Sequence, residues 1–363
     1  MERKYYVQTI AINYLKNLVN EPDSIRIHDQ FLHGLSNEEF ADGYNALLSL
    51  MRQLYDDIAS NPAGFNMALI DIKEQDEKSS DYTNSHNSFL RIPNLLYIIG
   101  AKSNIMPDMS LAIDGGALAA DAKWLKITGL PLLLDKLRGY GFEISDFGKA
   151  PKAGETLEVS FTDNRYLTAA LKSMAEATFE LSKGERNTLK TNYFYMMHPG
   201  ILENETVKEP KLTVDSILHV LDTAQRESAE SLHNAVAGRT KPTIAMRSFM
   251  RNDWRITYTG LKNKKVLMSL NVDQDNLSAK LNLQNISQYI SIVAEMPDKI
   301  QNVIRDGGWQ CGQCNPRCSG GFAFEMDSNE YNKCHCSAFV FGGLAMEDMG
   351  YYQQLLEREL QCH

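Results

Sequence analysis

Five of the chain's six cysteines lie within residues 311–336. They are Cys311, Cys314, Cys318, Cys334 and Cys336, and the first four follow the pattern C-x2-C-x3-C-x15-C. Structural zinc takes four soft ligands in a tetrahedron, and a closely spaced cysteine pair can supply two of them from one turn. We therefore predict one structural zinc ion per chain, held by Cys311, Cys314, Cys318 and Cys334.

The residues around the cysteines fit such a site. Alternating phenylalanines predict two strands, one containing Phe322 and one containing Phe341, which return Cys334 to the end where the other three cysteines lie. Arg317 and Lys333 could offset the charge of four thiolates. A site closed by four protein ligands stabilises the fold and leaves no position for a substrate.

Other interpretations of the cysteines stay open. His335 and Cys336 compete with Cys334 as the fourth ligand, because residues 334 and 336 would share one face of a strand. The cysteines could also be free thiols, hold an iron–sulfur cluster, or form a redox pair. A redox pair typically opens a helix, and Pro316 and the nearby glycines argue against a helix here.

The N-terminal part of the sequence predicts helices. Ser36 and Glu39 fit a capping box, and apolar residues follow at three- and four-residue steps, so we predict a helix over 36–58. Residues 5–19 suit a shorter helix. The polar stretch 73–88 has no periodicity and predicts a loop or an insertion.

The middle of the chain predicts a small α/β unit. A helix ends at Gly139, strands begin at Phe142 and cover 156–161, and an amphipathic helix covers 167–181. The order suggests a winged-helix-like module, but we expect no tight helix–turn–helix pair in it. A DNA-reading role is therefore not the favoured interpretation.

The C-terminal part predicts an antiparallel sheet with helices. Three strand-like runs follow one another in meander order, separated by polar turns, between a long helix and the cysteine segment. The expected helices cover 214–237, 286–305 with a break at Pro297, and 346–361, and the expected strands cover 254–259, 265–272 and 277–283.

These elements predict an α+β fold with three regions. Residues 1–110 form a mainly helical region, residues 111–205 the small α/β unit, and residues 211–363 an α+β domain that carries a zinc-knuckle-like insertion. The polar segment 203–210 is the expected boundary before the last domain.

Charge and composition limit the partners. The formal net charge of −9 gives no general attraction to nucleic acid or to an anionic membrane. The stretch 239–265 is the one place where nucleic acid could bind, since basic residues alternate there with Phe249 and Trp254, although such a stretch is more often a solvated face. We expect a cytoplasmic protein, because no apolar run approaches membrane-spanning length and the cysteines are clustered.

Parts of the chain resemble a group of proteins. The strands "WRITYTGLKNKKVLMSLNV", the cysteine cluster, and the segments around "EYNKCHCSAFVFGG" and "LRGYGFEISDF" are similar to an uncharacterised family common in Gram-positive bacteria. The resemblance implies that Cys334 is the lone fourth cysteine and that Cys336 stands where a small residue is usual. It implies no activity.

The function predicted from the sequence is a binding or regulatory module with a structural zinc site. The alternatives are an enzyme of unknown class with its site between the domains, or a thiol redox protein. No nucleophile elbow, phosphate-binding loop or dinucleotide fingerprint is found in the sequence.

Overall fold

The computed structural model describes residues 3–22, 24–72, 80–148, 150–185, 189–273, 276–312 and 320–362. Its helices and antiparallel sheets make the chain an α+β protein, which confirms the predicted fold class. The chain divides into two compact units, Met1–Lys211 and Leu212–His363. The expected regions 1–110 and 111–205 both lie within the first unit. Among the described residues, no helix is long and apolar enough to cross a membrane.

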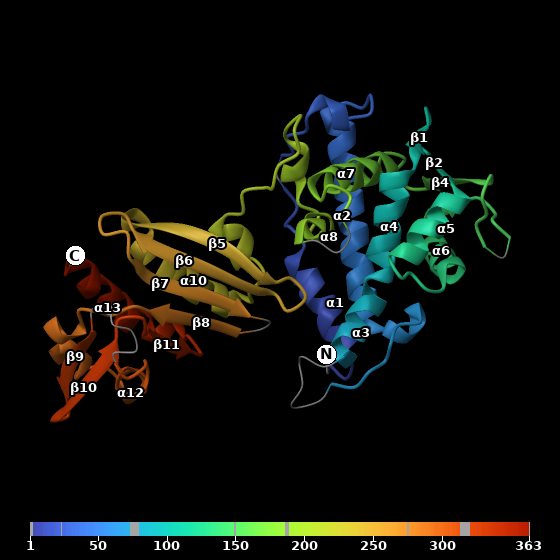
Figure 1. The fold of residues 1–363 in the computed structure, drawn as a ribbon. Helices are drawn as coiled ribbons and strands as arrows, with labels where there is room; N and C mark the ends of the chain where they lie inside the picture. Colours follow the sequence, from blue (N-terminus) through green and yellow to red (C-terminus); the bar gives the residue numbers. More distant parts are fainter. Residues whose placement is uncertain are drawn as a thin grey trace. The chain divides into compact units, whose positions relative to one another are not determined.

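Long helices build the first unit (Figure 1). The predicted capping box at Ser36 and Glu39 is present, and each residue's side chain meets the other's backbone N–H. Helix α1 packs on α2, and α7 packs on both α2 and α4. The helices are α1 (Tyr6–Asn17), α2 (Asn37–Ser60), α3 (Ser80–Phe89), α4 (Arg91–Lys102), α7 (Leu167–Leu181) and the short α8 (Asn192–Tyr195), with 3-10 turns η1 (Asp29–Phe31), η2 (Pro62–Phe65), η3 (Leu189–Thr191) and η4 (Pro199–Leu202).

Helix α3 corrects the prediction of a loop over 73–88. Residues 80–89 are helical, while 73–79 lie outside the described residues. The helix forms because Tyr82, Ser85 and Phe89, at three- and four-residue steps, are buried against the unit. The apolar pattern of the sequence does not reveal this buried helix face, because only two of its three buried side chains are apolar.

A helix–turn–helix with a following hairpin also lies in the first unit. Residues 125–129 join α6 to α5, a helix that the sequence analysis did not predict. The two helices pack little on each other, so the expectation of no tight pair is not contradicted. The elements follow one another along the chain as α4, β2, α5, α6, β3 and β4, and the antiparallel sheet has the order β1-β2-β4-β3. Both orders are those of a winged helix. The bounds are β1 (Asn104–Ile105), β2 (Leu111–Asp114), α5 (Gly115–Trp124), α6 (Leu130–Arg138), β3 (Phe142–Ile144) and β4 (Thr156–Phe161).

Helix α6 is poorly suited to reading DNA, although it occupies the position of a recognition helix. Its exposed side chains include Leu132 and Asp135. Arg138 donates to the backbone O of Ile144 at 2.7 Å and to Asp135. Base readout needs free arginine, lysine or amide groups, which these exposed positions do not offer.

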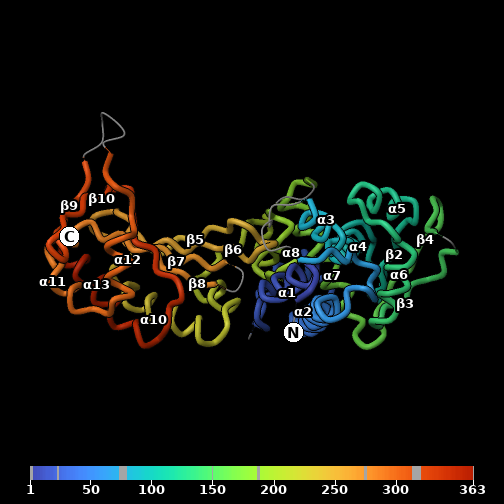
Figure 2. Tube along the Cα trace, turned by 90° about the horizontal axis from the view of Figure 1, so that it is seen from below, coloured from blue at the N-terminus to red at the C-terminus, as the bar shows by residue number. Residues whose placement is uncertain are grey.

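The second unit is built on a five-stranded antiparallel sheet in the order β11-β8-β7-β6-β5. Helices α10 and α13 cover one face, where His233 Nδ1 lies 3.1 Å from Tyr258 Oη and the rings of Phe341 and Tyr352 meet (Figure 1). Figures 1 and 2 both show α12 beside the β9–β10 hairpin. The bounds are α9 (Val214–Leu218), α10 (Thr223–Val236), β5 (Thr240–Ser248), β6 (Asp253–Gly260), β7 (Val266–Asp273), β8 (Asn276–Leu281), α11 (Ile290–Val293), α12 (Asp298–Asp306), β9 (Gly321–Met326), β10 (Asn329–Cys334), β11 (Phe339–Gly342) and α13 (Met349–Gln361), with turns η5 (Ala237–Arg239), η6 (Ile286–Gln288) and η7 (Met346–Asp348).

Two predictions about strand pairing and helix length are wrong. The strand containing Phe341, β11, pairs with β8 in the main sheet, and β9 pairs with β10 through a tight turn at Asp327 and Ser328. The helix expected over 214–237 is two helices, because the Asp222 side chain accepts the N–H of Gln225 and begins α10 there.

In the basic stretch 239–265 the side chains of Arg239, Lys241 and Arg247 are exposed beside a buried core, which agrees with the favoured interpretation of a solvated face. Residues 240–248 form the edge strand β5, which the sequence analysis missed. Trp254 and Phe249 are buried, so they form no stacking platform for bases beside the basic side chains. Basic and aromatic residues alternate in this part of the sequence because every second residue of β6 points into the core.

The contact between α4 and α7 generates a first prediction. A Cβ at Gly100 would lie 2.6 Å from the Cβ of Ala175, so Gly100→Ala should destabilise the first unit by about 1–3 kcal/mol. Gly350→Ala, on an open face of α13, should instead stabilise the second unit by up to about 1 kcal/mol. Hydrogen exchange during urea titration reports each unit separately, and equal effects of the two substitutions would contradict the packing argument.

Two buried histidines generate a second prediction. Burial lowers the pKa of His86 and of His198 to about 4, and His198 Nδ1 accepts the N–H of Gly200, which requires an unprotonated nitrogen. The unfolded chain binds these protons near pH 6.5, so stability should be constant above that pH and should fall as the pH drops toward 4. Between pH 7 and 5 the loss is roughly 2 kcal/mol per histidine. Urea unfolding of the first unit measures it, and the same fall in the His86→Gln/His198→Gln variant would disprove this origin.

Candidate functional site

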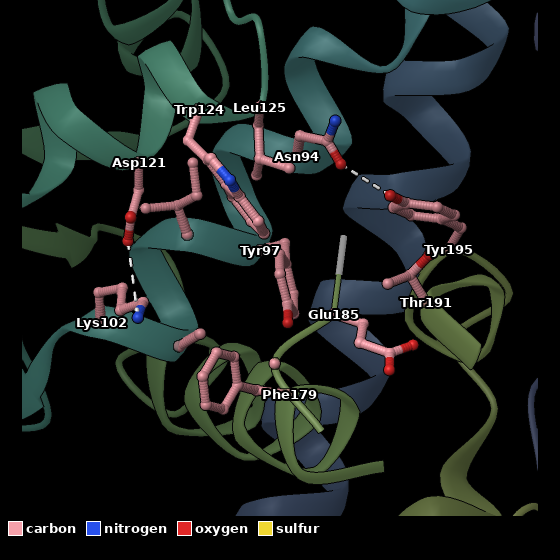
Figure 3. Close-up of a pocket in the computed structure, with 13 residues that line it drawn as sticks. Asn94, Tyr97, Lys102, Asp121, Trp124, Leu125, Phe179, Glu185, Thr191 and Tyr195 are labelled. Atoms are coloured by element: carbon pink, nitrogen blue, oxygen red, sulfur yellow. Dashed lines mark hydrogen bonds and ion pairs between the residues drawn. The ribbon is translucent and has the colours of Figure 1, made fainter. Parts of the chain in front are cut away.

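A cavity of about 390 Å³ lies within the first unit. Its walls come from α4, α5, the end of α7 and the segment that leads into α8 (Figure 3). Asn94, Tyr97, Ile98 and Ala101 line it from α4, at the three- and four-residue steps that place side chains on one face of a helix. This volume is within the usual range of small-molecule pockets, about 300–1,000 Å³.

Aromatic side chains dominate the walls. Tyr97, Trp124, Phe179 and Tyr195 come from four different helices or helix ends and converge on the cavity (Figure 3). Trp124 is 48% exposed and Phe179 is 40% exposed, although large aromatic side chains gain most by burial. A ligand in the cavity would cover surface that the unit itself leaves open.

The polar groups of the cavity are few and mostly paired. The Tyr195 hydroxyl donates to Asn94 Oδ1 at 2.7 Å, which ties α8 to α4. Lys102 Nζ lies 3.7 Å from Asp121 Oδ2 and 4.7 Å from the centre of the Phe179 ring. Burial raises the pKa of Tyr97 to about 12, so its hydroxyl stays neutral and able to donate a hydrogen bond at physiological pH.

The lining combines aromatic walls with a few polar groups. No histidine, cysteine or serine is found among the described residues that line the cavity. A serine or cysteine nucleophile is thus absent from the described lining, whereas Asp121, Glu185 and Tyr97 are of types that can act as general acids or bases. A mainly apolar wall with a few fixed polar groups is instead typical of a ligand-binding site.

The sequence analysis did not find this cavity. Its lining residues are spread from Asn94 to Tyr195 and meet only when α4, α5 and α7 pack. One local signal was present, since Trp124 stands between Lys123 and Lys126 on a segment with no clear apolar stripe. A single exposed aromatic residue is common on protein surfaces, so this signal alone did not indicate a site.

The cysteine segment lies at one end of the second unit. Of the four predicted zinc ligands, Cys311 and Cys334 are described, whereas Cys314 and Cys318 lie outside the described residues. Among the described residues, no group of three or more histidine, cysteine and acidic side chains could hold a metal ion. The prediction of a zinc site therefore stays a prediction.

The two described ligands meet at Gly321. In the β9–β10 ladder Cys334 pairs directly with Gly321, and a Cβ at Gly321 would lie 2.8 Å from the Cβ of Cys311. The ladder continues on the other side of β10, where Cys311 N donates to Asn332 O and Cys334 N to Trp309 O. Cys311 and Cys334 are thus both next to Gly321, where a larger residue would collide with the Cβ of Cys311.

Cys336 is placed differently from the prediction. Strand β10 ends at Cys334, and residues 335 and 336 form a turn, so 334 and 336 do not share a strand face. The N–H of Cys336 donates to Cys334 Sγ at 3.4 Å. Such N–H···S bonds support thiolates that bind metals, which favours Cys334 as the ligand.

The Lys333 ammonium has a backbone partner of its own. This buried ammonium donates to the backbone O of Arg305 at 2.9 Å, in the last turn of α12. A cation there satisfies a free carbonyl and meets the negative end of the helix dipole. Neighbouring residues of a strand point to opposite faces, so Lys333 and Cys334 point apart. Arg317 lies outside the described residues.

Comparison of the chain with protein-family models, with curated proteins and with solved structures gave no match. The function must therefore be argued from the residues and the two sites alone.

Proposed function

We propose that this chain is a non-enzymatic binding module whose first unit holds a small organic molecule. The observation that carries the proposal is the cavity of about 390 Å³ with partly exposed aromatic walls. An aromatic side chain left open to water on a pocket wall gains free energy when a ligand covers it, at about 25 cal/mol for each Å² of apolar surface. The four aromatic side chains give a ligand the large contact area that binding needs.

The choice between a binding module and an enzyme rests on the lining. The enzyme alternative called for a site with titratable groups of perturbed pKa that could act on a substrate. In the cavity the perturbed groups are the hydroxyls of Tyr97 and Tyr195, whose pKa values burial raises, and neither is activated as a base or a nucleophile. Binding alone is the simpler role for these residues.

Filling the cavity tests the proposal. Ala101→Phe places a ring in the cavity without removing a contact, so it should weaken binding of the neutral probe 2-phenylethanol at least about tenfold, equivalent to about 1.4 kcal/mol. Ala63→Phe, at an exposed position outside the cavity, should leave binding unchanged. Saturation-transfer NMR measures the binding. A probe that does not bind the unsubstituted chain, or binds both variants equally, would reject the pocket as a binding site.

The proposal assigns a structural role to the second unit, with one zinc ion on Cys311, Cys314, Cys318 and Cys334. It is supported by the approach of Cys311 and Cys334 at Gly321 and by the N–H···S bond that Cys334 accepts. Zinc would add stability there without chemistry, because four protein ligands leave no open position.

Two neighbouring cysteines provide a matched test of this assignment. The unsubstituted chain should carry one zinc, Cys334→Ser should lose most of it, and Cys336→Ser should keep it, because only Cys334 is a ligand. Elemental analysis of protein purified without added metal gives the ratios, and strong chelation should destabilise the second unit alone. Equal zinc content in both variants, or a metal-free chain with readily oxidised thiols, would refute the assignment and favour redox chemistry.

A further inference from the structure

The charges around the cavity of the first unit are unequal. Its lining includes two carboxylates, Asp121 and Glu185, and one ammonium, Lys102. Lys102 is already paired with Asp121 at 3.7 Å. Glu185 is exposed, and no ion pair to it is found among the described residues of the unit. Among the described lining residues, the carboxylates therefore outnumber the ammonium groups by one.

The aromatic walls also favour a positively charged ligand. Aromatic faces carry negative electrostatic potential and attract cations that lie within about 6 Å of the ring centre. The cavity already holds one such contact, since Lys102 Nζ lies 4.7 Å from the centre of the Phe179 ring. The rings of Tyr97 and Trp124 line the same space from α4 and α5 (Figure 3).

We propose that this pocket selects an organic cation, a molecule with an apolar body and an ammonium group. The apolar body lies against Tyr97 and Trp124, and the ammonium group pairs with Glu185. This inference rests on the proposed function, because it names the class of ligand that the pocket binds. An anionic ligand fits less well, since the cation among the described lining residues, Lys102, is neutralised by Asp121.

Three probes of similar size and different charge separate the possibilities. They are 2-phenylethylammonium, neutral 2-phenylethanol and anionic 3-phenylpropanoate, titrated against the full chain by NMR or calorimetry at low ionic strength. We expect the cation to bind about 5- to 10-fold more tightly than the neutral probe, and the anion most weakly. The advantage of the cation should shrink as salt is added.

Substitutions with opposite expected effects locate the charge recognition. Glu185→Gln should reduce the advantage of the cation to about twofold and leave the neutral probe unchanged, whereas Glu180→Gln, at an exposed residue outside the cavity, should change neither. Lys102→Met frees Asp121 and the face of Phe179, so it should tighten binding of the cation severalfold.

The outcomes distinguish this inference from the proposed function. Equal binding of the cation and the neutral probe would overturn charge selection and keep the pocket as an apolar binding site. Tightest binding of the anion, abolished by Lys102→Met, would reverse the assignment and make Lys102 the recognition group. If none of the three probes binds, the inference and the proposed function both fail.

Discussion

The close packing of α4 against α7 is the contact on which the first unit depends. Gly100 on α4 lies so near Leu171 and Ala175 that no side chain fits between the two helices. Both helices are largely buried along their length, and α7 also packs on α2. A helix held this tightly on one side has its other side fixed in space. The backbone that carries the wall residues Asn94, Tyr97 and Ala101 is therefore positioned by this helix contact.

The winged-helix arrangement supplies part of the cavity wall. Its first helix, α4, and its second, α5, supply walls of the aromatic cavity, while its third, α6, presents Leu132 and Asp135 to solvent. The Tyr195–Asn94 hydrogen bond joins the later helix α8 to the same wall. The motif thus positions a pocket, and its chemistry is that of the pocket lining.

The second unit has a core of its own. Its sheet buries Trp254, Ile256 and Tyr258 beneath helices, so it has its own core without the cysteines. The β9–β10 hairpin and α12 form an additional layer, joined by Lys333 to Arg305 O and by an ion pair between Arg305 and Asp327. This layer also has buried apolar side chains of its own, among them Phe324 on β9 and Ile304 on α12.

The sequence alone determined the elements whose signals are local. The capping box at Ser36, the strand over 156–161 and the helix over 167–181 follow from short-range periodicity and hydrogen bonding, and the structure confirms them. The cysteine spacing likewise defined a candidate metal site by itself. Only the tertiary structure decided that β11 pairs with β8, that Trp254 is buried and that Tyr97, Trp124 and Phe179 share a cavity. These facts depend on contacts between residues far apart in the chain, which periodicity does not encode.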